Sequence, residues 1–394
     1  MSGILSEGVQ LGDRLVVKKK LGKGGMSIVW LAEGKRGERY AVKEPIISGE
    51  KPENVERNVK FVEHEGKMLK MFNHPNICRL YDMKRGRLGN TATILLFLEY
   101  LDGGSLRDIP EPLDAKKLKD VAIQILEGLS EVHKAGVVHR DIKPSNIMAS
   151  RGQYKLVDFG TAIHHFEKAL HIVVSPRGYT APEQLIYGLV APQVDVWSVG
   201  ATLVWAYTKQ HPDKFMKGYD KDRVVGPVEV SLPSTGDSLL DSFLAKALEP
   251  DYRKRFTDAA EALAFLKGVS IKEKSGLRLK LLGQSVYVDQ GQLIIGRTED
   301  KEKHLKIEGH YLYIYDENRY ISRQHAEIAE ISGRWYIRDL GSVNKTAVYR
   351  NGEWIQVWKG RGTTSQWVEL RHGDLIALGY DESKGPYMVI TVHL

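Results

Sequence analysis

The sequence contains a single cysteine, Cys78, among 394 residues. One thiol allows neither an internal disulfide framework nor a zinc site built from several cysteines, and it is typical of a reducing compartment. The longest apolar runs, Ile94 to Leu98 and Val196 to Tyr207, fall short of the roughly 20 residues that a transmembrane helix needs. Residues 1–10 also lack the basic stretch and long apolar core of a secretory signal. We therefore expect a cytoplasmic protein with no membrane span.

Acidic residues are slightly fewer than basic ones, so that 57 Lys and Arg against 50 Asp and Glu give a net charge of +7. The basic residues are interleaved with acidic ones along the chain, and we expect no nucleic-acid partner. A content of 42% hydrophobic and 27% charged residues is typical of folded globular proteins. Because 394 residues exceed the usual size of one core, the chain is predicted to be multidomain.

Two regions of different periodicity make up the first two thirds of the chain. Residues 12–100 alternate as strands do, with one helical stretch at 55–72, which predicts a small β-rich lobe. Apolar residues recur at helical spacing in residues 101–267, which predicts a helical lobe. Thr257 is the expected N-cap of its last helix, which runs to Leu266. The other helices predicted in this lobe start at Leu118 and end before Gly136, or cover Asp195 to Tyr207 and Ser238 to Leu248.

The last third of the chain has a different pattern of apolar residues and turns. Residues 268–275 are charged and flanked by glycine, which predicts a linker between a first domain at 1–267 and a second at 276–394. The second domain alternates strands rich in Tyr, Ile, Val and Trp with Gly-containing turns, a pattern typical of an all-β sandwich.

A glycine-rich segment, LGKGGMSIV at residues 21–29, lies between two predicted strands. Glycines there would let backbone N–H groups approach phosphate oxygens, although most such segments are ordinary turns. Its third glycine position is Ser27, which gives less clearance. Lys43 follows at the end of an apolar strand, where its cation could pair with nucleotide phosphates. The alternative is a solvated lysine.

The helical stretch at 55–72 offers Lys43 a partner. Glu65 has apolar neighbours at offsets of three, four and seven residues, so it lies on the buried face of this helix. A carboxylate in that position needs a cation, which Lys43 would provide. Glu63 shares its face with lysines and is expected to be solvated.

Two motifs in the predicted helical lobe are highly specific in this order and spacing: HRDIKPSN at residues 139–146 and DFG at residues 158–160. With them, residues 12–267 resemble the eukaryotic-type (Hanks) protein kinases. The resemblance implies a bilobal α+β protein kinase fold followed by the all-β domain.

Phosphoryl transfer has a highly charged transition state, so its catalysis is mostly positioning and charge neutralisation. The resemblance implies that Asp141 orients or deprotonates the substrate hydroxyl, while Lys143 steadies the γ-phosphate and indicates Ser or Thr substrates. Asn146 and Asp158 offer the hard oxygen ligands that Mg²⁺ prefers, with Mn²⁺ as an alternative. The residues expected to contact ATP are Leu21, Gly22, Gly24, Val29, Ala41, Lys43, Glu99, Leu101 and Met148.

Further kinase landmarks match by position. Asp195 begins the helix that anchors the catalytic loop, and Glu183 is expected to pair with Arg255. Leu98 takes the gatekeeper position. The apolar spine between the lobes is expected to comprise Leu69, Leu80, His139 and Phe159.

Arg140, before Asp141, resembles kinases that are switched on when an activation-loop phosphate pairs with that arginine. The segment at residues 174–179 departs from the family's usual Gly-Thr before the tyrosine, so the phosphorylated hydroxyl stays open among three candidates. His164, His165 and His171 are expected to be solvated and not to hold a metal. The candidate phosphosites are Thr161, Ser175 and Thr180.

In residues 276–394, four short motifs recur in the order seen in forkhead-associated (FHA) domains: Gly-Arg at 296–297, SRQHA at 322–326, DLGSVNKT at 339–346 and GDLI at 373–376. FHA domains read phosphothreonine peptides with loops at one end of a sandwich. Lys345 stands where the family has glycine, so strain of roughly 1 kcal/mol is expected if its φ is positive. The resemblance implies that Arg297 and Ser322 bind the phosphate and that Arg323 assists them. It also implies that Asn344 binds the peptide backbone and that His325 has a structural role.

The sequence thus predicts an ATP-dependent Ser/Thr protein kinase that autophosphorylates and uses an FHA domain to recruit substrates or to regulate itself. Its partners would be protein substrates and phosphothreonine peptides. One alternative is a pseudokinase scaffold without catalysis, which would lack one of Lys43, Asp141, Asn146 or Asp158. Another is a degenerate FHA domain that only packs against the kinase.

Overall fold

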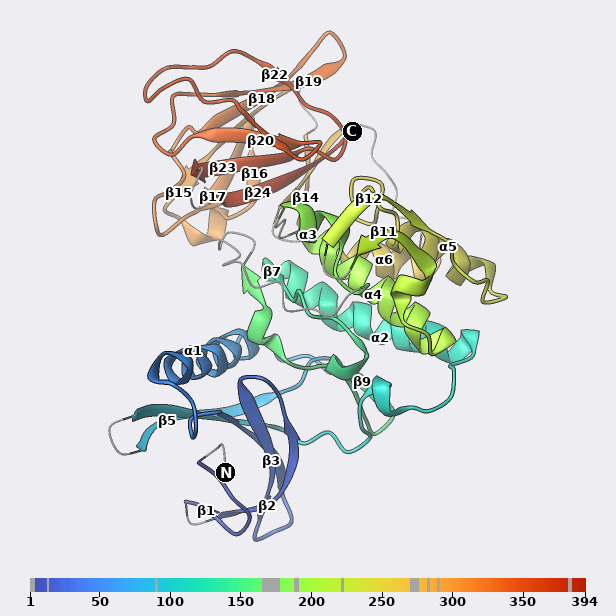
Figure 1. Cartoon of the computed structure of the whole chain (residues 1–394). Helices are drawn as coiled ribbons and strands as arrows, with labels where there is room; N and C mark the ends of the chain where they lie inside the picture. Colours follow the sequence, from blue (N-terminus) through green and yellow to red (C-terminus); the bar gives the residue numbers. More distant parts are fainter. Residues whose placement is uncertain are drawn as a thin grey trace.

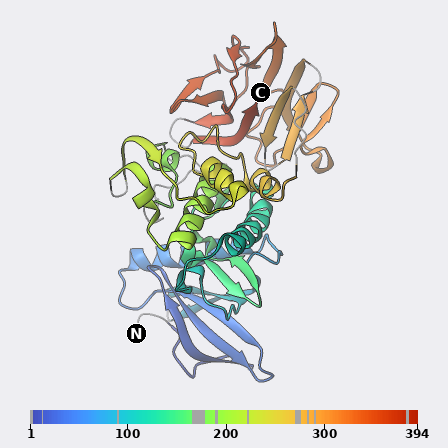
Figure 2. The same cartoon turned by 90° about the vertical axis from the view of Figure 1, so that its right-hand side faces the viewer.

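The computed structural model describes residues 4–12, 14–88, 91–164, 178–187, 191–220, 223–269, 276–281, 284–288, 291–381 and 385–394. A unit of two lobes is followed by a β-sandwich, as the sequence predicts. The sandwich lies against the larger lobe, at the end opposite the smaller lobe (Figure 1), and the view turned by 90° shows the same arrangement (Figure 2). Among the described residues, no helix has the length and apolar character to cross a membrane.

The small lobe is a six-stranded antiparallel sheet with strand order β1-β2-β3-β4-β6-β5, accompanied by helix α1. Helix α1 runs from Pro52 to Leu69, three residues earlier than predicted, because a proline favours the first turn of a helix. A separate apolar cluster around Trp30 and Phe97 packs on this sheet. The strands are β1 (Gln10–Leu11), β2 (Leu15–Lys23), β3 (Ser27–Gly34), β4 (Arg39–Pro45), β5 (Leu80–Leu88) and β6 (Thr91–Glu99).

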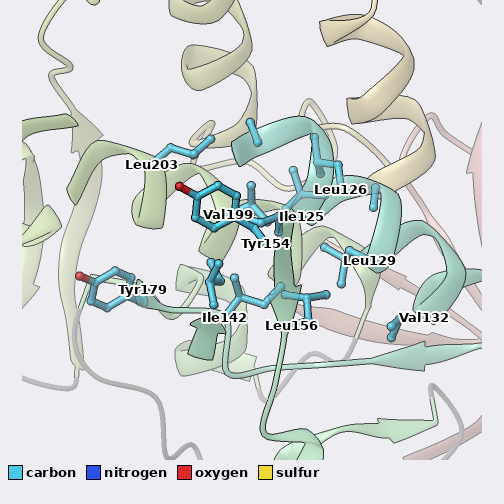
Figure 3. Packing of buried hydrophobic residues seen from close by; sticks show 14 of the residues in the cluster. Ile125, Leu126, Leu129, Val132, Ile142, Tyr154, Leu156, Tyr179, Val199 and Leu203 are labelled. Atoms are coloured by element: carbon cyan, nitrogen blue, oxygen red, sulfur yellow. The ribbon is translucent and has the colours of Figure 1, made fainter. Parts of the chain in front are cut away.

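The large lobe is built around helix α4 (Pro192–Thr208), which is buried along most of its length. A helix that is apolar on all sides belongs inside a core. Figure 3 shows part of this core, including Ile125 of α2, Val199 of α4 and Leu156 of β9. The remaining elements of this lobe are α2 (Ala115–Lys134), α3 (Pro182–Tyr187), α5 (Ser238–Ala247), α6 (Ala259–Leu266), β7 (Val137–Val138), β8 (Ile147–Ser150), β9 (Gln153–Leu156), β10 (Ile163–His164), β11 (Met216–Asp220), β12 (Arg223–Val230), and the 3₁₀ turns η1 (Leu106–Asp108), η2 (Pro144–Asn146), η3 (Phe159–Thr161) and η4 (Pro212–Phe215).

The N-cap predicted for the last helix is wrong by one residue. Asp258 is the N-cap, and its carboxylate accepts a hydrogen bond from Glu261 N at 2.9 Å. Thr257 instead donates its N–H and its hydroxyl to the carboxylate of Glu261, at 3.0 and 2.6 Å. Both residue types are good caps, so local sequence alone does not distinguish them.

The C-terminal domain consists of two six-stranded sheets, of order β14-β13-β24-β23-β20-β21 and β16-β17-β15-β18-β19-β22. Alternate residues of strands such as β13 are buried, as expected when one face of each sheet meets the other. The elements are β13 (Leu277–Leu281), β14 (Gln284–Val288), β15 (Gln292–Thr298), η5 (Lys301–Lys303), β16 (Lys306–Glu308), β17 (Tyr311–Tyr315), β18 (Ala326–Ile331), β19 (Arg334–Asp339), β20 (Thr346–Arg350), β21 (Glu353–Gln356), β22 (Val368–Glu369), β23 (Leu375–Asp381) and β24 (Gly385–His393).

Candidate active site and phosphate-binding site

Three charged side chains from three elements meet between the lobes. Lys43 of β4 places its Nζ 2.5 Å from Glu65 Oε2 of α1 and 3.2 Å from Asp158 Oδ1, which precedes η3. The side chains of Lys43 and Glu65 are 7% and 1% exposed. The partner predicted from the helical face of Glu65 is therefore the observed one. Glu63 is 26% exposed and pairs with Arg85 at 2.6 Å instead.

Burial and charge act in opposite directions in this cluster. Burial alone would lower the pKa of Lys43, but the carboxylates of Asp158 and Glu65 outweigh it and the pKa lies above its ordinary value. Burial raises the pKa of Glu65 to about 7 against the attraction of Lys43. Burial would also raise the pKa of Asp158, yet Lys43 holds it below its ordinary value. Lys43 is thus a fixed cation at this site.

Asp141 is the centre of a second group of contacts. Lys143 Nζ lies 2.8 and 2.7 Å from its two carboxylate oxygens, and Asn146 Nδ2 donates to Asp141 Oδ2 at 2.8 Å. Burial raises the pKa of Asp141, although the Lys143 cation opposes the shift. Because the Asn146 nitrogen is bound to Asp141, the amide oxygen is the atom of Asn146 that remains for a cation.

The oxygen atoms of Asn146 and Asp158 suit a magnesium ion that is also bound by a nucleotide. Asn146 and Asp158 supply hard oxygen atoms, which Mg²⁺ prefers, and Mg²⁺ usually takes only one or two carboxylates together with phosphate oxygens. Within the part of the chain that the structure describes, no group of three or more His, Cys, Asp or Glu side chains forms a metal cage. Phosphate oxygens would therefore complete the coordination.

Asp195 holds the loop that carries Asp141. Its carboxylate accepts hydrogen bonds from His139 N at 2.7 Å and from Arg140 N at 2.8 Å. Arg140 has φ +65°, a conformation that a non-glycine residue adopts only when its surroundings impose it. Phe159 packs edge-on against the His139 ring, with centroids 4.6 Å apart. The loop and the DFG segment are therefore fixed relative to each other.

The glycine-rich segment at residues 21–29 leaves open space beside Gly22 and Gly24, where phosphates are expected. A Cβ added to Gly22 would meet no described atom within 4 Å, and one added to Gly24 would lie 3.8 Å from Ser27 O. Gly24 N donates to Ser27 O at 2.8 Å, which closes the turn. Glu99, at the end of β6, forms an ion pair with Lys155 at 2.9 Å. Leu98 and Leu101 are buried, Val29, Ala41 and Met148 are half-buried, and Leu21 is exposed.

The end of the activation segment is anchored by a buried ion pair. Arg255 Nη1 and Nη2 lie 2.6 and 3.2 Å from the Glu183 carboxylate oxygens, which confirms the predicted pair. Thr161 Oγ1 donates to His139 O at 3.1 Å, and Thr180 is buried. Ser175, His165 and His171 lie outside the described residues.

The residues predicted to bind phosphate lie together in one set of loops of the sandwich. Arg297 is the last residue but one of β15, and its side chain is 10% exposed. Its Nη1 donates to Glu299 Oε1 at 3.0 Å, and Nε has no described partner. A buried guanidinium with a spare N–H is suited to an anion. Ser322 Oγ accepts from Val343 N at 3.2 Å, and Asn344 Nδ2 donates to Tyr320 O at 2.9 Å. Arg323 is exposed beside them, and its backbone oxygen leaves no room for a side chain at Gly296.

His325 braces two of these loops. Its Nδ1 accepts from Ser322 N at 3.0 Å, so the proton lies on Nε2, which donates to Lys345 O at 3.1 Å. Lys345 has φ +62°, the positive value that the missing glycine suggested. Its carbonyl also accepts from Gly379 N at 3.0 Å, and these bonds hold the strained residue in place.

A pocket of about 480 Å³ adjoins Asn344 and Lys345. Tyr320 and Tyr387 line it, and their rings stack with centroids 4.5 Å apart. Neither this pocket nor the Arg297–Glu299 pair was predicted. The pocket walls come from loops and strands far apart in the sequence, so no local pattern marks them.

Comparison with known proteins agrees with this geometry. Residues 15–265 match the family described as protein kinase domain, and residues 293–379 match the FHA domain family. The chain therefore belongs to the protein kinase family and carries an FHA domain after its kinase domain.

Its relatives include serine/threonine kinases from distant organisms. The chain is 30% identical over 274 residues to a probable serine/threonine-protein kinase of Streptomyces coelicolor, with 64% of this chain and 40% of that protein covered. It is 29% identical over 270 residues to serine/threonine-protein kinase D of Synechocystis, covering 64% and 51%. With cyclin-dependent kinase 4 of Xenopus laevis the identity is 35% over 193 residues, covering 44% and 60%. The chain thus spans less than two thirds of the length of these relatives.

Proposed function

We propose that this chain transfers the γ-phosphoryl group of ATP to Ser or Thr hydroxyls of proteins. The observation that carries the proposal is the buried contact of Lys43 with both Glu65 and Asp158 beside the Asp141–Asn146 pair. A lysine cation fixed by two carboxylates can hold nucleotide phosphates in place, and phosphoryl transfer depends mainly on such positioning.

Each residue has a separate task in this mechanism. Lys43 binds nucleotide phosphates, and Asp141 accepts the proton of the substrate hydroxyl or aligns it for attack. Lys143, which contacts Asp141, places a second cation where the γ-phosphate would lie. Asn146 and Asp158 would hold Mg²⁺, or Mn²⁺ in its place, and the ion would neutralise phosphate charge.

Transfer of label from radioactive ATP to casein tests the proposal. Asp141→Asn should reduce transfer at least about 10²-fold, because it removes the proton acceptor. Asp120→Asn, the same change at an aspartate whose side chain is 48% exposed, is the matched control and should transfer label as the wild type does. Equal label from the wild type and Asp141→Asn would exclude catalysis by this site. Absence of label in both would favour the pseudokinase scaffold.

We further propose that the FHA domain binds phosphothreonine peptides, with Arg297, Ser322 and Arg323 on the phosphate and Asn344 on the peptide backbone. The spare Nε of a nearly buried Arg297 supports this assignment. A charge-assisted hydrogen bond contributes roughly 1.5–3 kcal/mol, so Arg297→Ala should weaken binding by at least about tenfold. Fluorescence anisotropy with phosphorylated and unphosphorylated peptide pools measures this. Arg334→Ala, at a 69% exposed arginine of the same domain, is the control.

Recruitment of substrates that are already phosphorylated is the role we propose for this binding. Arg297→Ala should then slow phosphorylation of a phosphothreonine-bearing substrate and leave phosphorylation of casein unaffected, whereas equal losses on both would contradict recruitment.

For autophosphorylation we propose Ser175, because Thr161 is hydrogen-bonded and Thr180 is buried. Mass spectrometry of the protein after incubation with ATP would locate the site.

The domain limits that we propose are 1–267 for the kinase, 268–275 for the linker and 276–394 for the FHA domain.

We also propose a cytoplasmic location. The single thiol, Cys78, is buried, and burial raises its pKa to about 12, so it stays unreactive.

A further inference from the structure

The FHA domain contacts the large lobe through a built interface. Tyr252 of the large lobe is buried in one apolar cluster with Tyr349, Leu375 and Val389 of the FHA domain. Beside it, Arg253 Nη1 donates to Asn351 Oδ1. The two domains thus share a buried apolar contact in addition to the linker that joins them.

A buried ion pair forms the polar part of this interface. Lys280 of β13 places its Nζ 2.6 Å from Asp258 Oδ2 and 2.5 Å from Thr257 Oγ1. The side chains of Lys280 and Asp258 are 11% and 2% exposed. Asp258 is the N-cap of α6, so a lysine of the FHA domain neutralises the carboxylate that starts a kinase helix. Removing that lysine would leave a buried carboxylate without its cation, which is costly.

Hydrogen bonds continue from α6 into the active site. The first helical N–H of α6, at Ala259, donates to His133 Nδ1 at 3.1 Å. His133 therefore carries its proton on Nε2, which donates to Asp195 Oδ2 at 3.0 Å. Asp195 is the residue that holds His139 N and Arg140 N, immediately before Asp141. His133 and Asp195 are 1% and 0% exposed, so water does not replace these bonds.

We propose that Lys280 is a positioning residue for the catalytic loop, and that the docked FHA domain is thereby a structural part of the kinase active site. Lys280 fixes the start of α6, α6 orients His133, and His133 orients the Asp195 carboxylate. Asp195 in turn keeps Arg140 in its left-handed conformation and Asp141 in place. The proposal rests on the proposed kinase activity only where turnover is the readout.

The test uses the full chain with Lys280→Met, which keeps the length of the side chain and removes its charge. Coupling through such networks changes rates by about tenfold, so kcat should fall by about that factor. KM for ATP should stay unchanged, because none of Lys280, Asp258 and His133 is among the residues expected to contact ATP. Lys280→Arg keeps the positive charge and should retain the wild-type kcat. Adding Asp258→Asn to Lys280→Met should restore kcat, because asparagine removes the uncompensated charge and is still a good N-cap. Lys306→Met, at an exposed lysine of the same domain, is the control.

Hydrogen exchange of the peptide containing His139 and Arg140 gives a readout that needs no activity. Lys280→Met should speed exchange there by about tenfold, and Lys306→Met should not. Wild-type kcat together with unchanged exchange at His139 and Arg140 in Lys280→Met would overturn the proposal. A wild type that transfers no phosphate, yet shows faster exchange in Lys280→Met, would refute the kinase activity and support the coupling.

Discussion

Arg255 belongs to a buried ion pair of the large lobe, and its replacement tests how this lobe is stabilised. The side chains of Arg255 and Glu183 are 0% and 3% exposed. Besides the two contacts with Glu183, Arg255 donates to Gln193 O at 2.9 Å and to Glu249 O at 3.0 and 2.8 Å. These bonds link the end of the activation segment, the start of α4 and the loop before α6.

The cost of Arg255→Met follows from what is left behind. Glu183 would stay buried without a cation, and breaking a buried pair on one side costs about 3–5 kcal/mol. In a domain of about 250 residues, 1 kcal/mol corresponds to about 2–4 °C in melting temperature. We therefore expect the kinase domain to melt roughly 6–20 °C lower.

Calorimetry of four proteins separates the pair from its surroundings: the wild type, Arg255→Met, Glu183→Gln, and the double variant. Glu183→Gln keeps the shape and removes the charge, so the double variant should be less destabilised than the sum of the two single variants. Additive losses, or a loss below about 1 kcal/mol in Arg255→Met, would show that the pair behaves like a surface ion pair and would refute this reasoning.

Three further changes have expected outcomes of defined sign. Burial lowers the pKa of His393 to about 3 from 6.5, so the unfolded chain binds the extra proton between these values and stability is lost as pH falls through them. His393→Phe should therefore reduce the slope of unfolding free energy against pH by up to about 1.4 kcal/mol per unit between pH 5 and 6. Burial raises the pKa of Glu65 from 4.5 to about 7, so the folded chain binds the proton and stability is lost as pH rises through this window. Glu65→Gln should therefore increase the slope by a similar amount, and a decrease would contradict the assignment for Glu65. Lys345→Gly should raise the free energy of unfolding of the FHA domain by about 1 kcal/mol in urea titrations, because φ is +62° there. Lys345→Ala, which keeps the strain and loses the contact of Nζ with the Trp358 ring, should not stabilise it.

Contiguous motifs made most of the candidate active site predictable. Asp141, Lys143 and Asn146 lie within six residues of one another, so one short loop determines their spacing, and Asp158 follows in the DFG segment. Glu65 was identified from helical periodicity, because the face of a helix that is buried can be read from the sequence. Arg297 and Asn344 were recognised from motifs in their own strands and loops.

Contacts between distant segments were not predictable in this way. The pocket beside Asn344 and the bond from Ala259 to His133 depend on how separate elements pack. The N-cap at Asp258 was missed by one residue because Thr257 is an equally good cap on local grounds.

The sequence alone determined the two domain types and the chemical groups that each site contains, since hydrophobic periodicity and short motifs are local properties of a chain. Tertiary structure alone decided that the FHA domain rests on the large lobe and that Lys280 meets Asp258 there. A lysine in a strand carries no local signal of its partner, because an ion pair between domains forms only after both have folded and packed together.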